Sequence, residues 1–184
     1  MKCPNLKEFH FIDNGLKLDE IKGELPTLNL NVLKITNHSE IYKLLIKSSV
    51  KSFHLTIPLN YSSNVSLREF LAQQANLKRM TIHIPCLSRY NFPDKLISTL
   101  SSDFNKPRAP LRVVIGNIDT TGHLIYFTNL QNLRVLEITL DYHTFSSDII
   151  ALPKVEHLIV NAKKSSLSSF LGKFPNLKSP EVTN

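Results

Sequence analysis

The chain has 184 residues, 42% of them hydrophobic and 20% charged, a balance typical of one globular domain that excludes collagen-like, low-complexity and coiled-coil classes. The formal net charge of +7 favours acidic partners, although the lysines and arginines are scattered and form no basic tail. Cys3 and Cys86 fit no metal-binding spacing, and the N-terminus lacks the apolar run of a secretory signal. We therefore expect a cytoplasmic or nuclear protein without a membrane-spanning segment.

A short apolar pattern recurs from the first residues onward. Leu6, Phe9 and Phe11 occupy the first, fourth and sixth positions of a unit whose ninth residue is Asn14, which is the template of a leucine-rich repeat. Seven further units follow in chain order, at Leu30/Leu33/Ile35, Val50/Phe53/Leu55, Leu77/Met80/Ile82, Leu111/Val113/Ile115, Leu133/Leu136/Ile138, Val155/Leu158/Val160 and Leu177/Pro180/Val182. The unit at Leu111/Val113/Ile115 is degenerate, because it keeps only the fourth position, Leu111, and the sixth, Val113, plus one apolar neighbour. Leu136 holds the fourth position of the next unit. Successive fourth positions lie 20 to 31 residues apart, close to the usual repeat length.

Between these predicted strands the apolar spacing changes to that of a helix. Ser66 and Glu69 form a capping box, and Leu67, Phe70 and Leu71 share one face of the helix that follows. Similar patterns come after Ser39, Asp94, Ser146 and Ser165, with apolar residues at Ile41/Leu44/Leu45, Leu96/Ile97/Leu100, Ile149/Ile150 and Leu167/Phe170/Leu171. The stretch 105–110 predicts a loop insertion.

A single unit of strand, turn and helix cannot bury its own apolar face, whereas stacked units share a continuous core. The sequence therefore predicts an α/β fold, a leucine-rich-repeat solenoid of about eight irregular repeats within a single domain, 1–184. Its parallel sheet is expected to line a concave face, and its short helices a convex face. A fragment of a longer protein and a complete repeat protein both remain open.

Several segments resemble the repeats of F-box/leucine-rich-repeat proteins. The phrase Phe-Leu, four or five residues, Asn-Leu-Lys closes a helix and opens a strand at 70–78 and at 170–178, and related phrases occur at 5–11 and 130–138. The resemblance implies that the repeats recruit a substrate, while a separate F-box docks on the adaptor of a cullin-based ubiquitin ligase. The first repeat begins by Leu6, so the chain holds no F-box.

Strand alternation turns the third, fifth and seventh positions of each unit toward the concave face. The fifth positions form a central column that is mostly basic or imidazole-bearing in the first five units, with His10, Lys34, His54 and Arg112, and acidic or neutral in the last three. The candidate partner-binding residues are His10, Lys34, His54, Arg79, Thr81, His83, Arg112 and Glu137. We expect them to bind a protein or an acidic or phosphorylated peptide. The alternative is a solvated sheet face without a ligand.

No glycine-rich phosphate loop or catalytic motif occurs, so the sequence predicts neither an enzyme nor a cofactor. His10, His54, His83 and His157 fall in different units, which argues against a metal site. Because imidazoles lose their charge near neutral pH, binding to an acidic partner should weaken as the pH rises. Three functions remain: substrate recruitment of the F-box type, a free-standing repeat adaptor, and a nucleic-acid-associated repeat protein. The last is disfavoured because no aromatic stacking residues alternate with the arginines.

Overall fold

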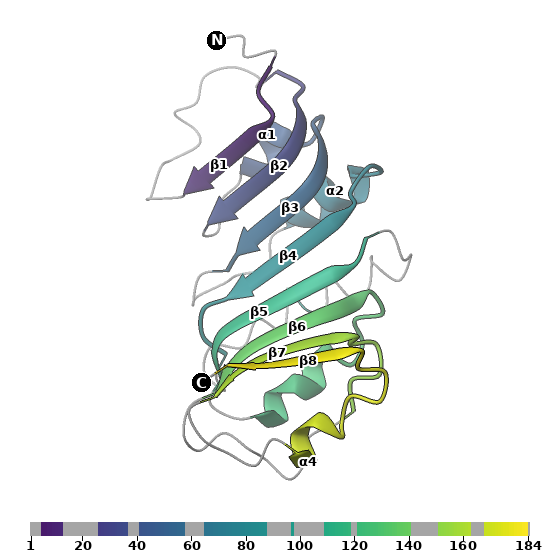
Figure 1. The fold of residues 1–184 in the computed structure, drawn as a ribbon. Coiled ribbons are helices and arrows are strands. Elements are labelled where there is room, and N and C mark those ends of the chain that lie inside the picture. Colours follow the sequence, from purple (N-terminus) through teal and green to yellow (C-terminus); the bar gives the residue numbers. More distant parts are fainter. Residues whose placement is uncertain are drawn as a thin grey trace.

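The computed structural model describes residues 5–12, 26–36, 41–57, 65–87, 97, 109–118, 121–140, 151–162 and 168–183. Eight strands pair in parallel, each with the next along the chain, into one open sheet (Figure 1). The strands are β1 Glu8–Ile12, β2 Asn29–Thr36, β3 Ser49–Thr56, β4 Arg79–Ile84, β5 Leu111–Ile118, β6 Leu133–Leu140, β7 His157–Ala162 and β8 Ser179–Thr183. The predicted α/β class and the predicted parallel sheet are confirmed.

The fourth positions of the first five units lie opposite one another in the sheet. Phe9 pairs with Leu33, Leu33 with Phe53, Phe53 with Met80, and Met80 with Leu111. From β2 onward these side chains are buried, because alternate strand residues point to the same face. The predicted register is therefore confirmed from β1 to β5.

The predicted register is wrong between β5 and β6. Leu136 pairs with Val113 and not with Leu111, which pairs with Leu133. The register shifts between Leu111 and Arg112, because Arg112 pairs with Val135 and Arg134 is the extra residue of β6. A shift of two residues leaves the buried face buried, so the hydrophobic pattern does not oppose it.

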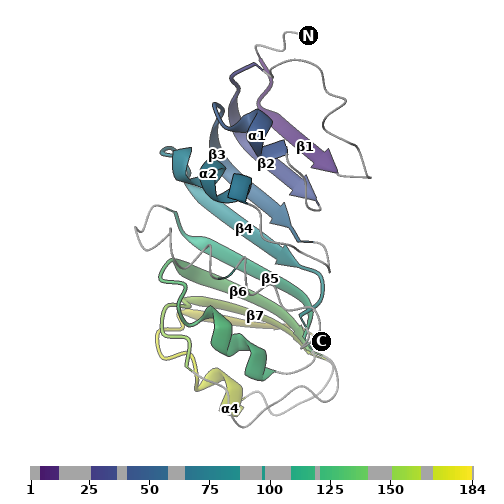
Figure 2. The same cartoon turned by 180° about the vertical axis from the view of Figure 1, so that it is seen from behind.

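The helical segments lie on one face of the sheet (Figure 2). They are α1 Ile41–Leu45, α2 Val65–Gln73 and α4 Ser168–Leu171, together with a 3-10 helix, η2 Thr121–Phe127. The helices expected after Ser39, Ser66 and Ser165 are thus confirmed, although α2 begins one residue before its predicted cap. The pattern did not predict η2. Ile97 is helical and buried, whereas the expected helix at Ile149/Ile150 and Asn14 lie outside the described residues.

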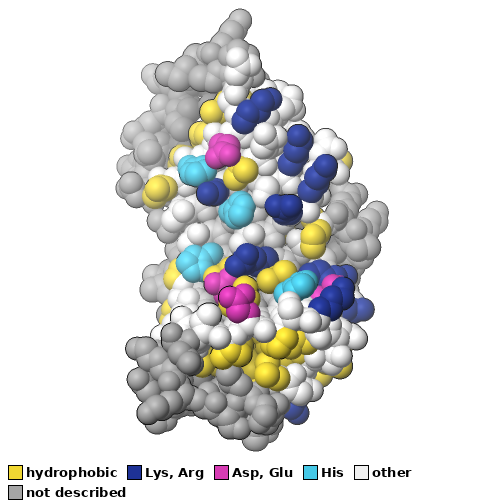
Figure 3. Space-filling view, in the orientation of Figure 1, with side chains coloured by type: hydrophobic (Ala, Val, Ile, Leu, Met, Phe, Trp, Pro, Cys, Tyr) yellow, Lys and Arg dark blue, Asp and Glu magenta, His cyan; other side chains and the backbone are white. Residues whose placement is uncertain are grey.

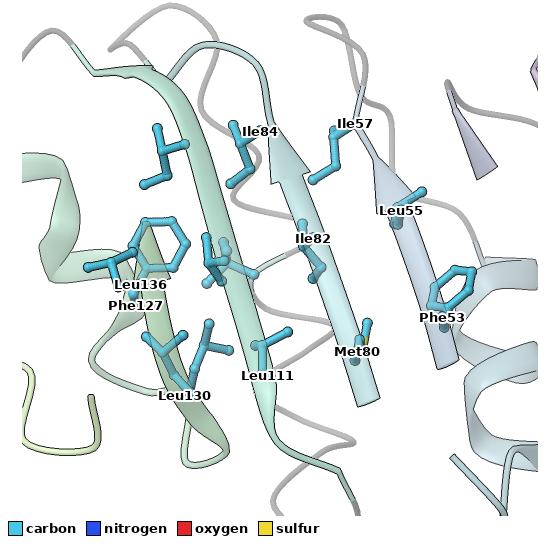
Figure 4. Close-up of a cluster of buried hydrophobic side chains, with 14 of the residues drawn as sticks. Phe53, Leu55, Ile57, Met80, Ile82, Ile84, Leu111, Phe127, Leu130 and Leu136 are labelled. Carbon is cyan, nitrogen blue, oxygen red and sulfur yellow. The ribbon is translucent and has the colours of Figure 1, made fainter. Parts of the chain in front are cut away.

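The core fills the space between the sheet and this helical layer (Figure 4). An aromatic group anchors its N-terminal half, where the ring centroids of Phe53 and Phe70 are 5.7 Å apart and that of Tyr42 is 5.7 Å from Phe70. All three side chains are almost fully buried. Helix and strand residues of neighbouring units therefore share one core, as stacking requires.

Amide side chains, of which Gln74 and Asn132 are buried, join the turns of neighbouring units. Gln74 is 2% exposed; its Oε1 accepts from the Val50 amide at 3.0 Å, and its Nε2 donates to the carbonyls of Ser48 and Phe70. Asn132 and Asn176 similarly donate to the carbonyls of Ala109 and Pro153, each 23 residues earlier. In these two copies of the Asn-Leu phrase the asparagine has a structural role: it donates to a backbone carbonyl of the preceding unit.

We predict that Gln74→Ala lowers the free energy of unfolding by at least about 2 kcal/mol, because it leaves buried backbone groups at Ser48 and Val50 without their partner. Gln73→Ala is the matched control, since Gln73 is exposed. Denaturant unfolding of the two variants measures the difference. Equal stability of the two variants would contradict this role.

Candidate functional site

The face of the sheet opposite the helices, here named the open face, carries the polar side chains of the strands (Figure 3). Lysine, arginine and histidine side chains gather over its upper part in this view, where β1 to β5 lie. Acidic side chains are fewer there. The open face is therefore the candidate site.

Five of the predicted site residues form one row across five strands. His10 pairs with Lys34, Lys34 with His54, His54 with Thr81, and Thr81 with Arg112. We call these five residues the central row. Lys34, His10 and Arg112 are exposed, and His54 and Thr81 are half-buried. The structure thus brings together the residues that the alternation of the strands predicted.

Arg79 and His83 flank Thr81 on β4, on the same face. Arg79 pairs with Ser52 of β3, and His83 pairs with Thr56. Arg79 adds a positive charge beside the central row, and His83 adds another when it is protonated. The row therefore lies within a broader basic surface.

Glu137 does not continue the central row, contrary to the sequence-based alignment. Because of the register shift, Val135 follows Arg112, and Glu137 pairs with Val114. The Arg112 guanidinium nevertheless reaches diagonally to Glu137 and forms an ion pair with it. Glu137 thus closes the basic row at β6 by partly neutralising its last cation.

His54 experiences the positive charges around it. Burial lowers the pKa of His54 below its ordinary value, and the nearby charges of Lys34, Arg112 and His10 lower it further. Its Nε2 lies 3.1 Å from the Ser52 hydroxyl. His10 has a nearby carboxylate, with Nε2 3.8 Å from Glu8 Oε2. An anion placed over His54 would meet a field that favours it.

A pocket of about 420 Å³ lies where β1 to β4 begin. Its lining residues are Lys7, Asn29, Leu30, Asn31, Ser49, Lys51, Asn76 and Lys78. Strand alternation does not predict them, because all of them precede the third position of their units. The available signal was the lysine that follows the first apolar position, in Leu6-Lys7, Val50-Lys51 and Leu77-Lys78.

No protein-family model, curated protein or solved structure matches this chain. Among the described residues, no group of three or more His, Cys, Asp or Glu side chains is placed to hold a metal ion. No helix in the described part of the chain has the length and apolar character needed to cross a membrane.

We predict that Lys34→Ala raises the pKa of His54, because it removes the strongest of the positive charges that oppose protonation of the ring. Lys154→Ala makes the same change in net charge on a turn before β7 and should leave His54 unchanged. Titration of the imidazole by NMR measures both. An unaltered His54 pKa in Lys34→Ala would show that this lysine does not act on the ring.

Proposed function

We propose that this chain is a leucine-rich-repeat module that binds an acidic segment of a partner protein across the N-terminal half of its open face. The central row is the observation on which this rests. His10, Lys34, His54 and Arg112 lie on four of five neighbouring strands, and the pKa of His54 is lowered first by burial and then by the positive charges of the other three. Charge complementarity of this kind increases the rate of association and selects among partners.

Three features support the leucine-rich-repeat assignment. The strands pair in chain order and in parallel, the helical segments cover one face, and the first, fourth and sixth positions of the units from β2 to β7 are largely buried. The amide bonds of Asn132 and Asn176 to the preceding unit give the recurrent Asn-Leu phrase a reason. Stacking of similar units explains all three features.

The charges of the open face also limit where an acidic segment binds. Glu137 on β6 and Glu181 on β8 both pair with Ile159 of β7, from its two sides, so β6 to β8 form one row that carries two carboxylates. This row would repel an acidic segment, whereas the central row would attract it. The segment should therefore lie over β1 to β5.

The F-box resemblance gives the proposal its specific form, in which the repeats recruit a substrate to a ubiquitin ligase. A free-standing adaptor would use the same surface without a ligase. The two forms differ only in what accompanies the repeats, because the open face is common to both.

We predict that Lys34→Glu weakens binding of an Asp/Glu-rich peptide by about tenfold or more, since it replaces a central cation by a repelling carboxylate. Lys154→Glu is the matched control and should bind like the unmodified chain. Fluorescence anisotropy at fixed ionic strength measures both affinities. Equal losses in both variants would mean that net charge alone, and not the central row, attracts the peptide.

The affinity for the same peptide should rise as the pH falls from 7.5 to 5.5. A bound anion stabilises the imidazolium of His54 and raises its lowered pKa, so the complex binds more protons than the free chain at pH values between the two pKa values. His54→Gln should flatten this dependence, whereas His157→Gln, which lies on β7, should keep it. A flat profile for the unmodified chain would refute the linkage.

The ligase form is tested with the full-length coding sequence. If the gene encodes an F-box ahead of Met1, its product should co-purify with the ligase adaptor, whereas the chain of 184 residues alone should not. Full-length product that carries no F-box and recovers no adaptor would leave the free-standing adaptor as the function.

A further inference from the structure

The residues at the starts of the strands form a second line of side chains, here named the entry column. In the C-terminal half it comprises Arg134, Glu156 and Lys178, because the Glu156 amide donates to the Arg134 carbonyl and the Lys178 amide to the Glu156 carbonyl, each at 2.8 Å. In the N-terminal half the Asn31 amide donates to the Lys7 carbonyl, and the Lys78 amide to the Lys51 carbonyl. Asn31 lies between Leu30 and Val32, which pair with Val50 and Ser52, so it is next to Lys51.

The C-terminal half of the entry column is a complete ion-pair network. Glu156 Oε1 lies 3.3 Å from Arg134 Nε, and Oε2 accepts a hydrogen bond from Lys178 Nζ. That hydrogen bond, with the charges of Lys178 and Arg134, lowers the pKa of Glu156. One carboxylate between two cations is therefore the arrangement that this column adopts when all three charges are present.

The N-terminal half has the cations without the carboxylate. Asn31 takes the place of Glu156, with Lys7 on one side and Lys51 on the other, and Lys78 follows on the next strand. Within the described part of the chain, no carboxylate lies within ion-pair distance of these three lysines. The pocket of about 420 Å³ opens at this place.

The lining of the pocket is rich in hydrogen-bond donors. Three lysines, three asparagines and Ser49 line it together with Leu30, and none of the described residues that line it is acidic. Asn76 Nδ2 donates one bond to Ser49 Oγ at 3.3 Å, and its amide has a second N–H. Figure 3 shows lysine and arginine side chains along the side of the sheet where its first strands begin.

We propose that this pocket binds a phosphate-type oxyanion with two or more negative charges, held between Lys7 and Lys51 above Asn31, with Lys78 as a third cation. The anion takes the place that Glu156 has in the other half of the sheet. A phosphoryl group suits the donors better than a carboxylate does, because it offers three strong acceptor oxygens and up to two charges. The volume lies in the range of small-molecule sites, about 300–1,000 Å³.

Two sources supply this chemistry, a free phosphorylated small molecule and a phosphorylated side chain of a protein. Neighbouring strands lie about 4.8 Å apart. Lys7 and Lys51 are two strands apart, so their backbones are separated by about 10 Å. Their long side chains can close on one pyrophosphate group from opposite sides. The pocket is separate from the central row, and the inference does not depend on the proposed function.

Titration with sodium pyrophosphate, followed by calorimetry and by backbone NMR, tests the site on the whole chain. We expect shifts at residues 7, 31, 51 and 78, and an affinity at least about tenfold weaker in Lys51→Ala, which loses a charged donor. Asn31→Glu should abolish binding, because it supplies the internal carboxylate that Glu156 supplies elsewhere. Asn31→Gln introduces a side chain of the same size as glutamate but without its charge, so this variant should bind pyrophosphate as the unmodified chain does.

Lys154→Ala is the control, and it should bind pyrophosphate as the unmodified chain does. Equal weakening in Lys154→Ala and Lys51→Ala, or undiminished binding by Asn31→Glu, would overturn the site. Failure of the acidic-peptide experiment with Lys34→Glu would leave these results untouched, so the two proposals fail separately. Lys51→Ala keeps the test decisive if Asn31→Glu does not fold.

A phosphoserine peptide and its serine counterpart distinguish the sources. Competition with pyrophosphate by the phosphopeptide alone, at equal or higher affinity, indicates a phosphorylated protein segment. Pyrophosphate binding with no competition indicates a free phosphorylated compound. Competition of equal strength by the unphosphorylated peptide would overturn the phosphate chemistry.

Discussion

Every strand in this fold depends on its neighbours, because a parallel strand with one apolar face has no partner within its own unit. Its backbone groups bond to the strands before and after it, and its inner side chains fill space shared with the adjoining helical segments. The contact of Phe53 with Tyr42 and Phe70 illustrates this, since the three rings come from β3, α1 and α2. The repeated apolar positions follow from that constraint: each unit must present the same residues at the same height.

The same constraint acts on the turns, where backbone groups also become buried. Strands that start in register bring their preceding turns into contact, and the carbonyls there lose access to water. Gln74 and Asn132 supply the missing donors from the next unit along the chain. The amide hydrogen bonds between the turns and the repeated apolar positions of the strands are therefore two results of one geometry. Both place the strand starts side by side, which is also what aligns the entry column.

Most of the sheet could be predicted because position within a strand determines burial, and burial leaves a pattern of apolar residues. That pattern has a period of two, so it cannot distinguish two registers that differ by two residues. Leu111 and Val113 could each face Leu136, and only the fold shows that Val113 does.

The pattern also missed η2, whose sequence lacks the capping box that marked α2. Side-chain pairing was harder still, since the reach of Arg112 to Glu137 depends on that shifted register. Lys7, Lys51 and Lys78 lie 44 and 27 residues apart, and their proximity appears only when the strand starts are aligned.

The distribution of charge along the sheet separates the needs of folding from those of binding. In the entry column a carboxylate at position 156 joins two cations, and its lowered pKa shows that the folded state favours the charged form. A carboxylate at position 31 would do the same for Lys7 and Lys51, at a site that is exposed and adjacent to both. Asn31 leaves those lysines to repel each other, and the central row adds the repulsion that lowers the pKa of His54. Like charges held together destabilise a folded chain, and an external anion relieves that repulsion. The uncompensated half of the sheet is therefore the half that we expect to bind a ligand.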